Sequence, residues 1–229
     1  MVNVVGRKAP EAPKERGRLS PAALQVGFVL LRDSDAGTLS LRELGHRAGV
    51  SHGAVALGLQ AMEARGWLRY LGAKGQPVAD WEGLLQAWAF GYADRLCARN
   101  YVTRGTPAGF TSLQAWREEI LQRLGASLAL LGGELAAENL GYGIIASSAV
   151  VHVPDWNAAT LRSLRLLPSE RGEVVVRRCF GTENQDPDHP RQAHPLLVLG
   201  ELSALNDSRL MAARVALRQS VLDQLRERA

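Results

Sequence analysis

Cysteine is scarce in this sequence of 229 residues, which contains only Cys97 and Cys179. Two cysteines so far apart exclude a disulfide framework and a cysteine-rich zinc site, and a reducing cytoplasm is the simplest setting for them. Long apolar runs are lacking too, since the longest, near residues 28–31, is far too short to cross a bilayer. The first residues also lack the apolar segment of a secretory signal peptide. We therefore expect a cytoplasmic protein.

Acidic residues are scarce in the first third of the chain. Residues 1–79 carry 11 Lys and Arg against 6 Asp and Glu, a net charge of +5, in a chain whose overall net charge is +4. Residues 80–229 carry 16 against 17, a net charge of −1. The positive charge is therefore concentrated in the N-terminal segment, which favours contact with a polyanion there.

Recognisable catalytic motifs are missing as well: the sequence has no GxGxxG, no P-loop and no strand–elbow–helix pattern around a serine. Gly132-Gly133 follows a predicted strand and is similar to the glycine pair that cradles phosphate in nucleotidyltransferases. Such enzymes need closely spaced carboxylates on an adjacent strand to hold magnesium, whereas Glu134 and Glu138 fall on a predicted helix. We interpret the glycines as a tight strand-to-helix turn and expect no enzymatic activity.

Residues of the types that bind metals gather in one polar, Pro-rich loop at residues 181–194. They are Asp186, Asp188, His189 and His194. A polar loop collects such residues by chance, so we expect neither a metal nor any other cofactor. We interpret His152, within the β-rich run at residues 149–153, as a hydrogen-bonded histidine rather than a catalytic base.

Residues 38–68 show the pattern of two short helices joined by a tight turn. The first helix, residues 41–48, ends at Gly49, a residue type that readily adopts the left-handed conformation of a helix terminus. Ser51 then offers a hydroxyl that caps the second helix, which Gly66 ends. The second helix carries an apolar stripe that would pack on the first, formed by Val55, Leu59 and Met62. Two helices connected in this way place the second one in the major groove of DNA.

A hairpin pattern follows the helix pair. Residues 67–71 alternate like a strand, residues 72–75 indicate a turn, and residues 76–78 begin a return strand. A helix that Ser20-Pro21 opens precedes the pair and would complete a three-helix core. The whole run, above all LRELGHRAGVSHGAVALGLQAMEARGWL, resembles the winged helix-turn-helix transcription regulators.

This resemblance implies a winged helix DNA-binding domain at residues 20–79, preceded by a flexible basic tail at residues 1–19. Two alternatives stay open at this point. One is an α-helical hairpin packed in a core without nucleic acid, and the other is a winged module used for protein contacts.

The resemblance also implies which residues meet DNA. The groove-facing positions of the second helix are Ser51, His52, Gly53, Ala56, Leu57 and Gln60. Few of these side chains are of the types that form hydrogen bonds with base edges. The positions suited to phosphate contacts are Arg42, Arg47, Arg65, Arg69 and Lys74. We therefore expect binding dominated by phosphate contacts, with further specificity from dimerisation, DNA shape or the tail.

The rest of the chain predicts a helical connector at residues 80–125 and a small mixed α/β domain at residues 126–229, so that the fold class is α+β. Asp80 opens a long helix with one apolar face, which either leads to the next domain or pairs with its copy in a dimer. Strands are predicted at residues 101–110, 127–131, 149–153, 172–180 and 196–199. Further helices are predicted at residues 113–124, 133–138, 156–164 and 207–226.

Four segments of this second half carry a further resemblance. They are SLALLGGELAAENL, AVVHVPDWNAATLRSLRL, GEVVVRRCF and HPLLVLGELSALNDSRLMAARVAL. In this order they resemble the C-terminal domain of the AbiE-type antitoxins, transcriptional regulators of abortive-infection, type IV toxin–antitoxin systems. The resemblance covers the chain from about Leu19 onward. It implies a DNA-binding autorepressor whose second domain helps to neutralise a nucleotidyltransferase-type toxin.

We therefore predict a transcriptional repressor that binds double-stranded DNA as a homodimer. The apolar stripes of the helices at residues 81–92 and 210–225 are available for the dimer interface, unless both are intramolecular core. The alternative functions are a protein-interaction module and an architectural or replication-associated DNA binder without regulatory targets. A nucleotidyltransferase-type enzyme comes last.

Overall fold

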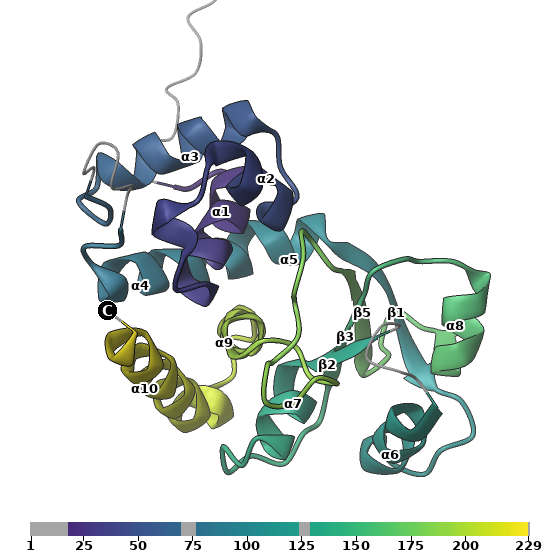
Figure 1. The fold of residues 1–229 in the computed structure, drawn as a ribbon. Helices are drawn as coiled ribbons and strands as arrows, with labels where there is room; N and C mark the ends of the chain where they lie inside the picture. The colour runs from purple at the N-terminus through teal and green to yellow at the C-terminus, as the bar shows by residue number, and fades with distance from the viewer. Residues whose placement is uncertain (1–17, 70–76, 124–128, 229) are drawn as a thin grey trace, which may run out of the picture.

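The computed structural model describes residues 18–69, 77–123 and 129–228, which form helices together with one mixed sheet, the α+β class that the sequence predicts. Figure 1 shows a group of helices built from the first part of the chain, the sheet beside it, and the C-terminal helices α9 and α10 next to α4. No helix among the described residues is both long and apolar enough to span a membrane.

The first three helices form where the sequence predicts them. They are α1 (Pro21–Arg32), α2 (Leu41–Ala48) and α3 (His52–Glu63). Ser20, Ser40 and Ser51 cap them, each accepting a hydrogen bond from a main-chain amide three residues later. A 3₁₀ turn, η1 (Ala36–Thr38), joins α1 to α2, and α1 packs against both α2 and α3.

The long helix predicted after residue 80 is present, with an irregularity. Asp80 caps α4 (Trp81–Gly91) through its Oδ1, which accepts from the amide of Gly83 at 2.9 Å. One turn of π-helix, η3 (Tyr92–Leu96), then leads into α5 (Cys97–Arg99). A single π turn inside a helix is uncommon and frequently marks a functional region.

Within the described residues, five strands form one sheet in the order β2-β3-β5-β1-β4. The strands are β1 (Tyr101–Pro107), β2 (Leu130–Gly132), β3 (Ala149–Val153), β4 (Leu166–Pro168) and β5 (Val174–Arg178). β3 and β5 are parallel, and the other neighbours are antiparallel. The other helices and turns are α6 (Leu113–Arg123), α7 (Gly133–Asn139), α8 (Ala158–Leu164), α9 (Pro195–Ala204), η4 (Ser208–Leu210) and α10 (Met211–Glu227).

The predicted strand at residues 196–199 is wrong, because this segment is the first half of α9. Pro195 stands at the start of the helix, and the Nδ1 of His194 accepts from the amide of Leu196 at 3.2 Å. Residues 196–202 are all buried, so the run is covered on every side and its periodicity does not distinguish a strand from a buried helix. The short strand β4 has no counterpart among the predictions.

Two apolar cores lie on the two sides of the sheet. The smaller one is formed by α6, α8 and the strand residues that face them, and contains Trp116, whose indole nitrogen donates to the carbonyl of Leu164 at 2.8 Å. The larger one joins α1–α4 to α9 and α10. In it, the indole nitrogen of Trp88 donates to the carbonyl of Leu24 at 2.9 Å. The helices that would meet DNA therefore share one continuous core with the C-terminal helices.

Both apolar stripes that the sequence offers for a dimer interface belong to this larger core. The stripe on α4 is represented by Leu84, Leu85 and Trp88, and the stripe on α10 by Leu217 and Val221. The alternative of intramolecular core is thus correct for both, and neither stripe is available to a second copy.

Candidate nucleic-acid interface

The positions that the sequence assigns to base contacts lie together on the outer face of α3. Ser51, His52, Gly53, Leu57 and Gln60 are exposed, and Ala56 is half-buried. The opposite face packs into the larger core through the predicted apolar stripe, Val55, Leu59 and Met62. The helix therefore presents a continuous surface of small and weakly polar side chains, with the N-terminus of the helix at one end.

α2 adds a basic edge to this surface. Arg42 is exposed and forms no ion pair with any residue that the structure describes. His46, one turn further along α2, is exposed as well and was not among the predicted contacts. Helical spacing alone was enough to place it beside Arg42.

Arg47, predicted to contact phosphate, is instead the centre of an ion-pair cluster. Its guanidinium lies 2.9 Å from a carboxylate oxygen of Asp33, 2.9 Å from one of Asp35 and 3.2 Å from one of Glu43. Burial opposes ionisation of Asp33, but hydrogen bonds from Arg32 and Arg47 outweigh it and hold the pKa of Asp33 below its ordinary value. These carboxylates occupy donors of the Arg47 guanidinium, which therefore stabilises the α1–α2 junction, and its contact with phosphate stays a prediction.

The described segments after α3, residues 67–69 and 77–79, pair with each other, and we call this pair of segments the ribbon. Leu68 and Val78 form an antiparallel bridge, and the amide of Arg69 donates to the carbonyl of Pro77 at 3.1 Å. The Arg69 side chain is exposed, whereas that of Arg65 is half-buried above the Trp67 ring, 5.6 Å from its centroid. Lys74 and the predicted turn at residues 72–75 lie outside the described residues.

Arg18, the first residue that the structure describes, contacts α4 and η3. Arg18 forms an ion pair of 3.1 Å with Asp94 and lies over the Phe90 ring, 5.7 Å from its centroid. Residues 1–17, which make up most of the predicted tail, lie outside the described residues.

Glu134 and Glu138, which follow the glycine pair, are bound to protein groups. Gly133 adopts a left-handed φ of 63° at the start of α7, as a tight strand-to-helix turn requires. Glu134 forms a 2.6 Å ion pair with Arg209 and accepts from Ser147 and Ser148. Glu138 accepts from Gln114 and from the amide of Ala146. The Glu134 carboxylate therefore links the start of α7 to Arg209 of η4, and both carboxylates hold the segment that precedes β3.

The residues of the polar loop also serve its own conformation. Asp186 is buried and accepts from the main-chain amides of Asp188 and His189, at 2.8 and 3.3 Å. His194 caps α9, and burial lowers its pKa to about 4. No cluster of three potential metal ligands occurs in the ranges that the structure describes.

A buried polar cluster beneath α9 was missed in the sequence. Glu201 accepts from the Tyr92 hydroxyl at 2.5 Å and lies 3.0 Å from the guanidinium of Arg177. Burial raises the pKa of Glu201, against the opposing effects of Arg177 and Tyr92. In the sequence, the signal for this cluster is a single carboxylate, that of Glu201, within the apolar run PLLVLGELSAL. The cluster joins the π turn of η3 to the sheet.

One ring nitrogen of His152, next to this cluster, lacks the hydrogen bond that the sequence interpretation expects. Its Nε2 lies 3.6 Å from Glu201 and has no hydrogen-bond partner among the described residues. Burial, and then the nearby charge of Arg177, lower the pKa of the His152 imidazole to about 3, so the ring is neutral near neutral pH.

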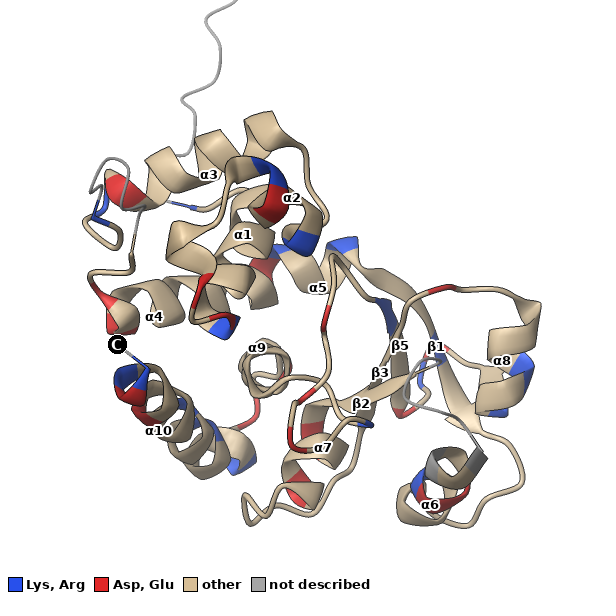
Figure 2. Cartoon of the chain, viewed as in Figure 1, with Lys and Arg blue, Asp and Glu red and all other residues tan. Residues whose placement is uncertain are grey.

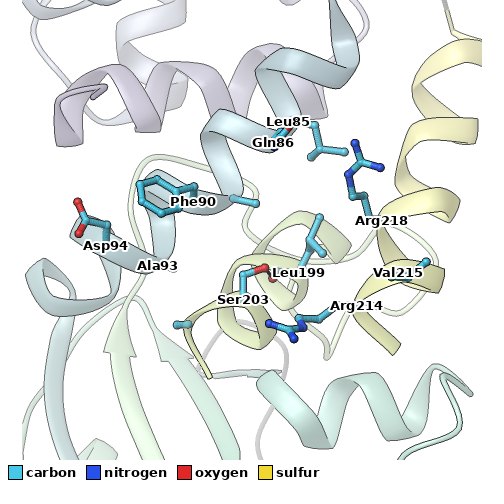
Figure 3. Close-up of a pocket in the computed structure, with 12 residues that line it drawn as sticks. Leu85, Gln86, Phe90, Ala93, Asp94, Leu199, Ser203, Arg214, Val215 and Arg218 are labelled. Carbon is cyan, nitrogen blue, oxygen red and sulfur yellow. Dashed lines mark hydrogen bonds between the residues drawn. The ribbon is translucent and has the colours of Figure 1, made fainter. Parts of the chain in front are cut away.

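A second surface feature is an apolar groove of about 610 Å³ between α4, α9 and α10. Figure 3 shows Phe90 on the α4 side and Arg214 and Arg218 projecting from α10 on the other side, with Leu199 and Ser203 of α9 between them. Phe90 and Val215 are 59% and 64% exposed.

Residues 78–223 match the family described as "Transcriptional regulator, AbiEi antitoxin, Type IV TA system". The matched segment covers more than half of the chain. The chain belongs to this family. It is thus related to transcriptional regulators that serve as antitoxins in type IV toxin–antitoxin systems, as the resemblance of the second half predicts. Comparisons with curated proteins and with solved structures gave no match.

The matched segment begins at the base of the ribbon and ends within α10, so it includes the sheet, α4 and α9. Helices α1–α3 precede it. The family relationship therefore rests on the second half of the chain, while the argument for DNA contact rests on the surface of α2, α3 and the ribbon.

Proposed function

We propose that the protein is a transcriptional regulator that binds double-stranded DNA through a winged helix-turn-helix formed by α1, α2, α3 and the ribbon after α3. The observation that carries the proposal is the outer face of α3, which leaves Ser51, His52 and Gln60 exposed while the rest of the helix packs into the core. A helix held in this way by a preceding helix and a short turn is the arrangement that enters a major groove.

Phosphate contacts supply most of the binding energy in this proposal. Arg42 and Arg69 flank α3 from α2 and from the ribbon, and both side chains are exposed. His52 and Gln60 offer hydrogen bonds to base edges, while Leu57, 69% exposed, offers an apolar contact to a thymine methyl group. So few polar side chains give modest discrimination for one copy of the chain.

As a member of its family, the protein acts in this proposal as a repressor in the cytoplasm, where it also binds a toxin of nucleotidyltransferase type. In this proposal Glu134, Glu138 and His194 have structural roles, through the partners described above. A nucleotidyltransferase gene beside its own would support the antitoxin role. The absence of such a gene would favour a regulator without a toxin.

The test of DNA binding uses the full-length protein and a labelled duplex of about 30 base pairs, long enough to cover more than one major-groove site. Arg42→Glu is expected to weaken binding at least about tenfold, because it places a negative charge against phosphate. Arg162→Glu, an exposed reversal on α8, is the matched control and should bind like the wild type. Equal losses in both variants, or a loss in neither, would contradict the assignment of the interface.

We also propose that two copies bind together on DNA, because a single α3 offers few base contacts. The surface available for a second copy is the groove of Figure 3, where the exposed Phe90 ring of each copy fills the groove of the other. Asp94 and Arg218 at the edges of the groove already form ion pairs within the chain, with Arg18 and Glu82, so the exposed Phe90 and Val215 supply the surface that a second copy would cover. Light scattering should give a dimer for the wild type and for Ile145→Glu, an exposed control, and a monomer for Phe90→Glu. A wild-type monomer, both free and on DNA, would rule out the dimer.

A further inference from the structure

A pocket of about 550 Å³ lies on the face of the sheet that carries Arg177. Residues of β1, β3 and β5 line it, together with residues of η3, α5 and the end of α9. Its volume falls within the range of about 300–1,000 Å³ that is typical of sites for small molecules. We call it the sheet pocket.

The sheet pocket contains two arginines on neighbouring strands, Arg104 of β1 and Arg177 of β5. Arg104 pairs with Val175, which precedes Arg177 by two residues on β5. Side chains two residues apart on a strand point to the same face, so the two arginines are diagonal neighbours with β-carbons about 7 Å apart. Figure 2 shows basic segments on both of these strands. One anionic group can therefore contact both guanidinium groups.

The donors of these arginines are only partly used within the protein. Arg177 donates through Nε to Glu201 at 3.1 Å and through Nη1 to the carbonyl of Cys97, and no described residue accepts a hydrogen bond from its Nη2. Arg104 is exposed, and its guanidinium forms no ion pair or hydrogen bond with any residue in the described ranges. Glu201 is the one carboxylate among the described residues that line the sheet pocket, so two arginines against one glutamate leave a net charge of +1.

An apolar surface lies beside these donors. Val150 and Val175 line the sheet pocket and are buried, but they belong to neither of the two apolar cores. The Tyr101 ring, 51% exposed, lines the pocket as well and stands opposite Arg177 in the pairing of β1 with β5. The pocket therefore combines donors for an anion with aliphatic and aromatic surface, the combination that holds a small ligand with one charged end.

We propose that the sheet pocket binds a small organic anion, a carboxylate or a phosphate monoester with an aromatic or other apolar body. The anionic group accepts from the Arg104 guanidinium and from the Nη2 of Arg177, and the body lies against Val150, Val175 and the Tyr101 ring. The ligand also contacts η3 and α5, which connect α4 to the sheet. This site goes beyond the proposed function and does not depend on DNA binding.

The experiment is an NMR titration of the full-length protein with three probes of similar size: benzoate, phenyl phosphate and benzyl alcohol. At least one of the two anions should bind with a Kd of about 1 mM or tighter, which is an ordinary affinity for so small a molecule. Benzyl alcohol has the ring without the charge and should bind at least about tenfold more weakly. The tighter of the two anions identifies the charged group that the pocket prefers.

Variants then locate the bound anion. Arg104→Ala should weaken binding about tenfold, because it removes a charged donor, and Arg104→Lys should keep part of the affinity. Ala98 is exposed and lines the sheet pocket, so Ala98→Trp should fill the space and abolish binding without disturbing a core. Arg162→Ala, on the exposed side of α8, should match the wild type.

Two results would overturn this proposal. One is a wild type that binds neither anion, and the other is an unchanged affinity in Arg104→Ala or in Ala98→Trp, which would place the anion elsewhere. Either result leaves the proposed function standing if the wild type binds duplex DNA. Anion binding by a protein that binds no DNA would overturn the proposed function alone.

Discussion

Gly49 and Gly181 meet backbone to backbone, at the point where the α2–α3 turn rests on the loop after β5. A β-carbon on Gly49 would lie 2.7 Å from the amide nitrogen of Gly181, and both glycines adopt left-handed φ values, 68° and 57°. Side chains are therefore excluded from this contact by space and by backbone conformation. The contact fixes the candidate DNA-binding helices on the sheet.

Substitution of Gly181 by alanine is expected to destabilise the protein by about 1–3 kcal/mol, because the new β-carbon would collide with the carbonyl of Arg47 and the backbone would be strained. Denaturant unfolding measures the loss. Gly53→Ala is the matched control, since its β-carbon would have no described atom within 4 Å. Equal stability of Gly181→Ala and the wild type would show that the contact is looser than described.

Arg47→Ala should lower stability by about 1–3 kcal/mol, because it leaves the partly buried Asp33 carboxylate without one of its partners. Its effect on DNA affinity should be nil, since the guanidinium is held by carboxylates. Thermal unfolding measures the loss of stability, and titrations with two different duplexes measure DNA binding. A stable Arg47→Ala variant with weakened DNA binding would return Arg47 to the interface.

The buried His152 imidazole should make stability fall in acid. Its pKa of about 3 in the folded chain lies below its ordinary value of 6.5, so between these pH values the unfolded chain binds a proton that the folded chain does not bind. Stability is then complete above pH 6.5 and is lost as the pH falls toward 3, and His152 contributes a loss of about 2 kcal/mol at pH 5.

Replacement of His152 by leucine should reduce this acid dependence in urea unfolding at pH 7 and pH 5. The remaining dependence includes His194, whose pKa is lowered in the same direction. His46→Gln, on the exposed side of α2, should keep the wild-type dependence. An unchanged difference between the two pH values in His152→Leu would contradict the burial argument.

Local signals in the sequence were sufficient for most of the elements. Ser20, Ser51 and Asp80 each cap the helix they were expected to open, because an N-cap needs only its own side chain and the next turn of backbone. The outer face of α3 followed from its periodicity. These features depend on residues three or four positions away in the chain, so they can be predicted from the sequence.

Features that depend on distant residues were not predicted. α9 was mistaken for a strand because its burial on all sides is a property of the whole core. The ion pairs of Arg47 were not predicted, because its partners Asp33 and Asp35 reach it only after α1 and α2 pack together. The contacts of Glu201 with Tyr92 and Arg177 likewise cross more than one element. The sequence shows which side chains are charged, whereas the ion pairs that they form depend on the tertiary structure.

The proposed phosphate contacts of Arg42 on α2 and Arg69 on the ribbon should act alike on all DNA sequences. Arg42→Ala and Arg69→Ala are each expected to weaken binding by a similar factor on any duplex, since phosphates carry no base information. Anisotropy titrations with several unrelated duplexes measure this. A loss confined to one duplex would mean that the altered arginine reads a base edge.

The most direct test of the central claim is selection of bound molecules from a pool of random duplexes, carried out in parallel with wild type and with His52→Ala. If α3 reads the major groove, the wild type should enrich one sequence motif, and loss of the His52 contact should change the preference at one or two positions by about 1 kcal/mol or more. No enriched motif for the wild type, or the same motif for both proteins, would contradict the claim that the outer face of α3 reads DNA.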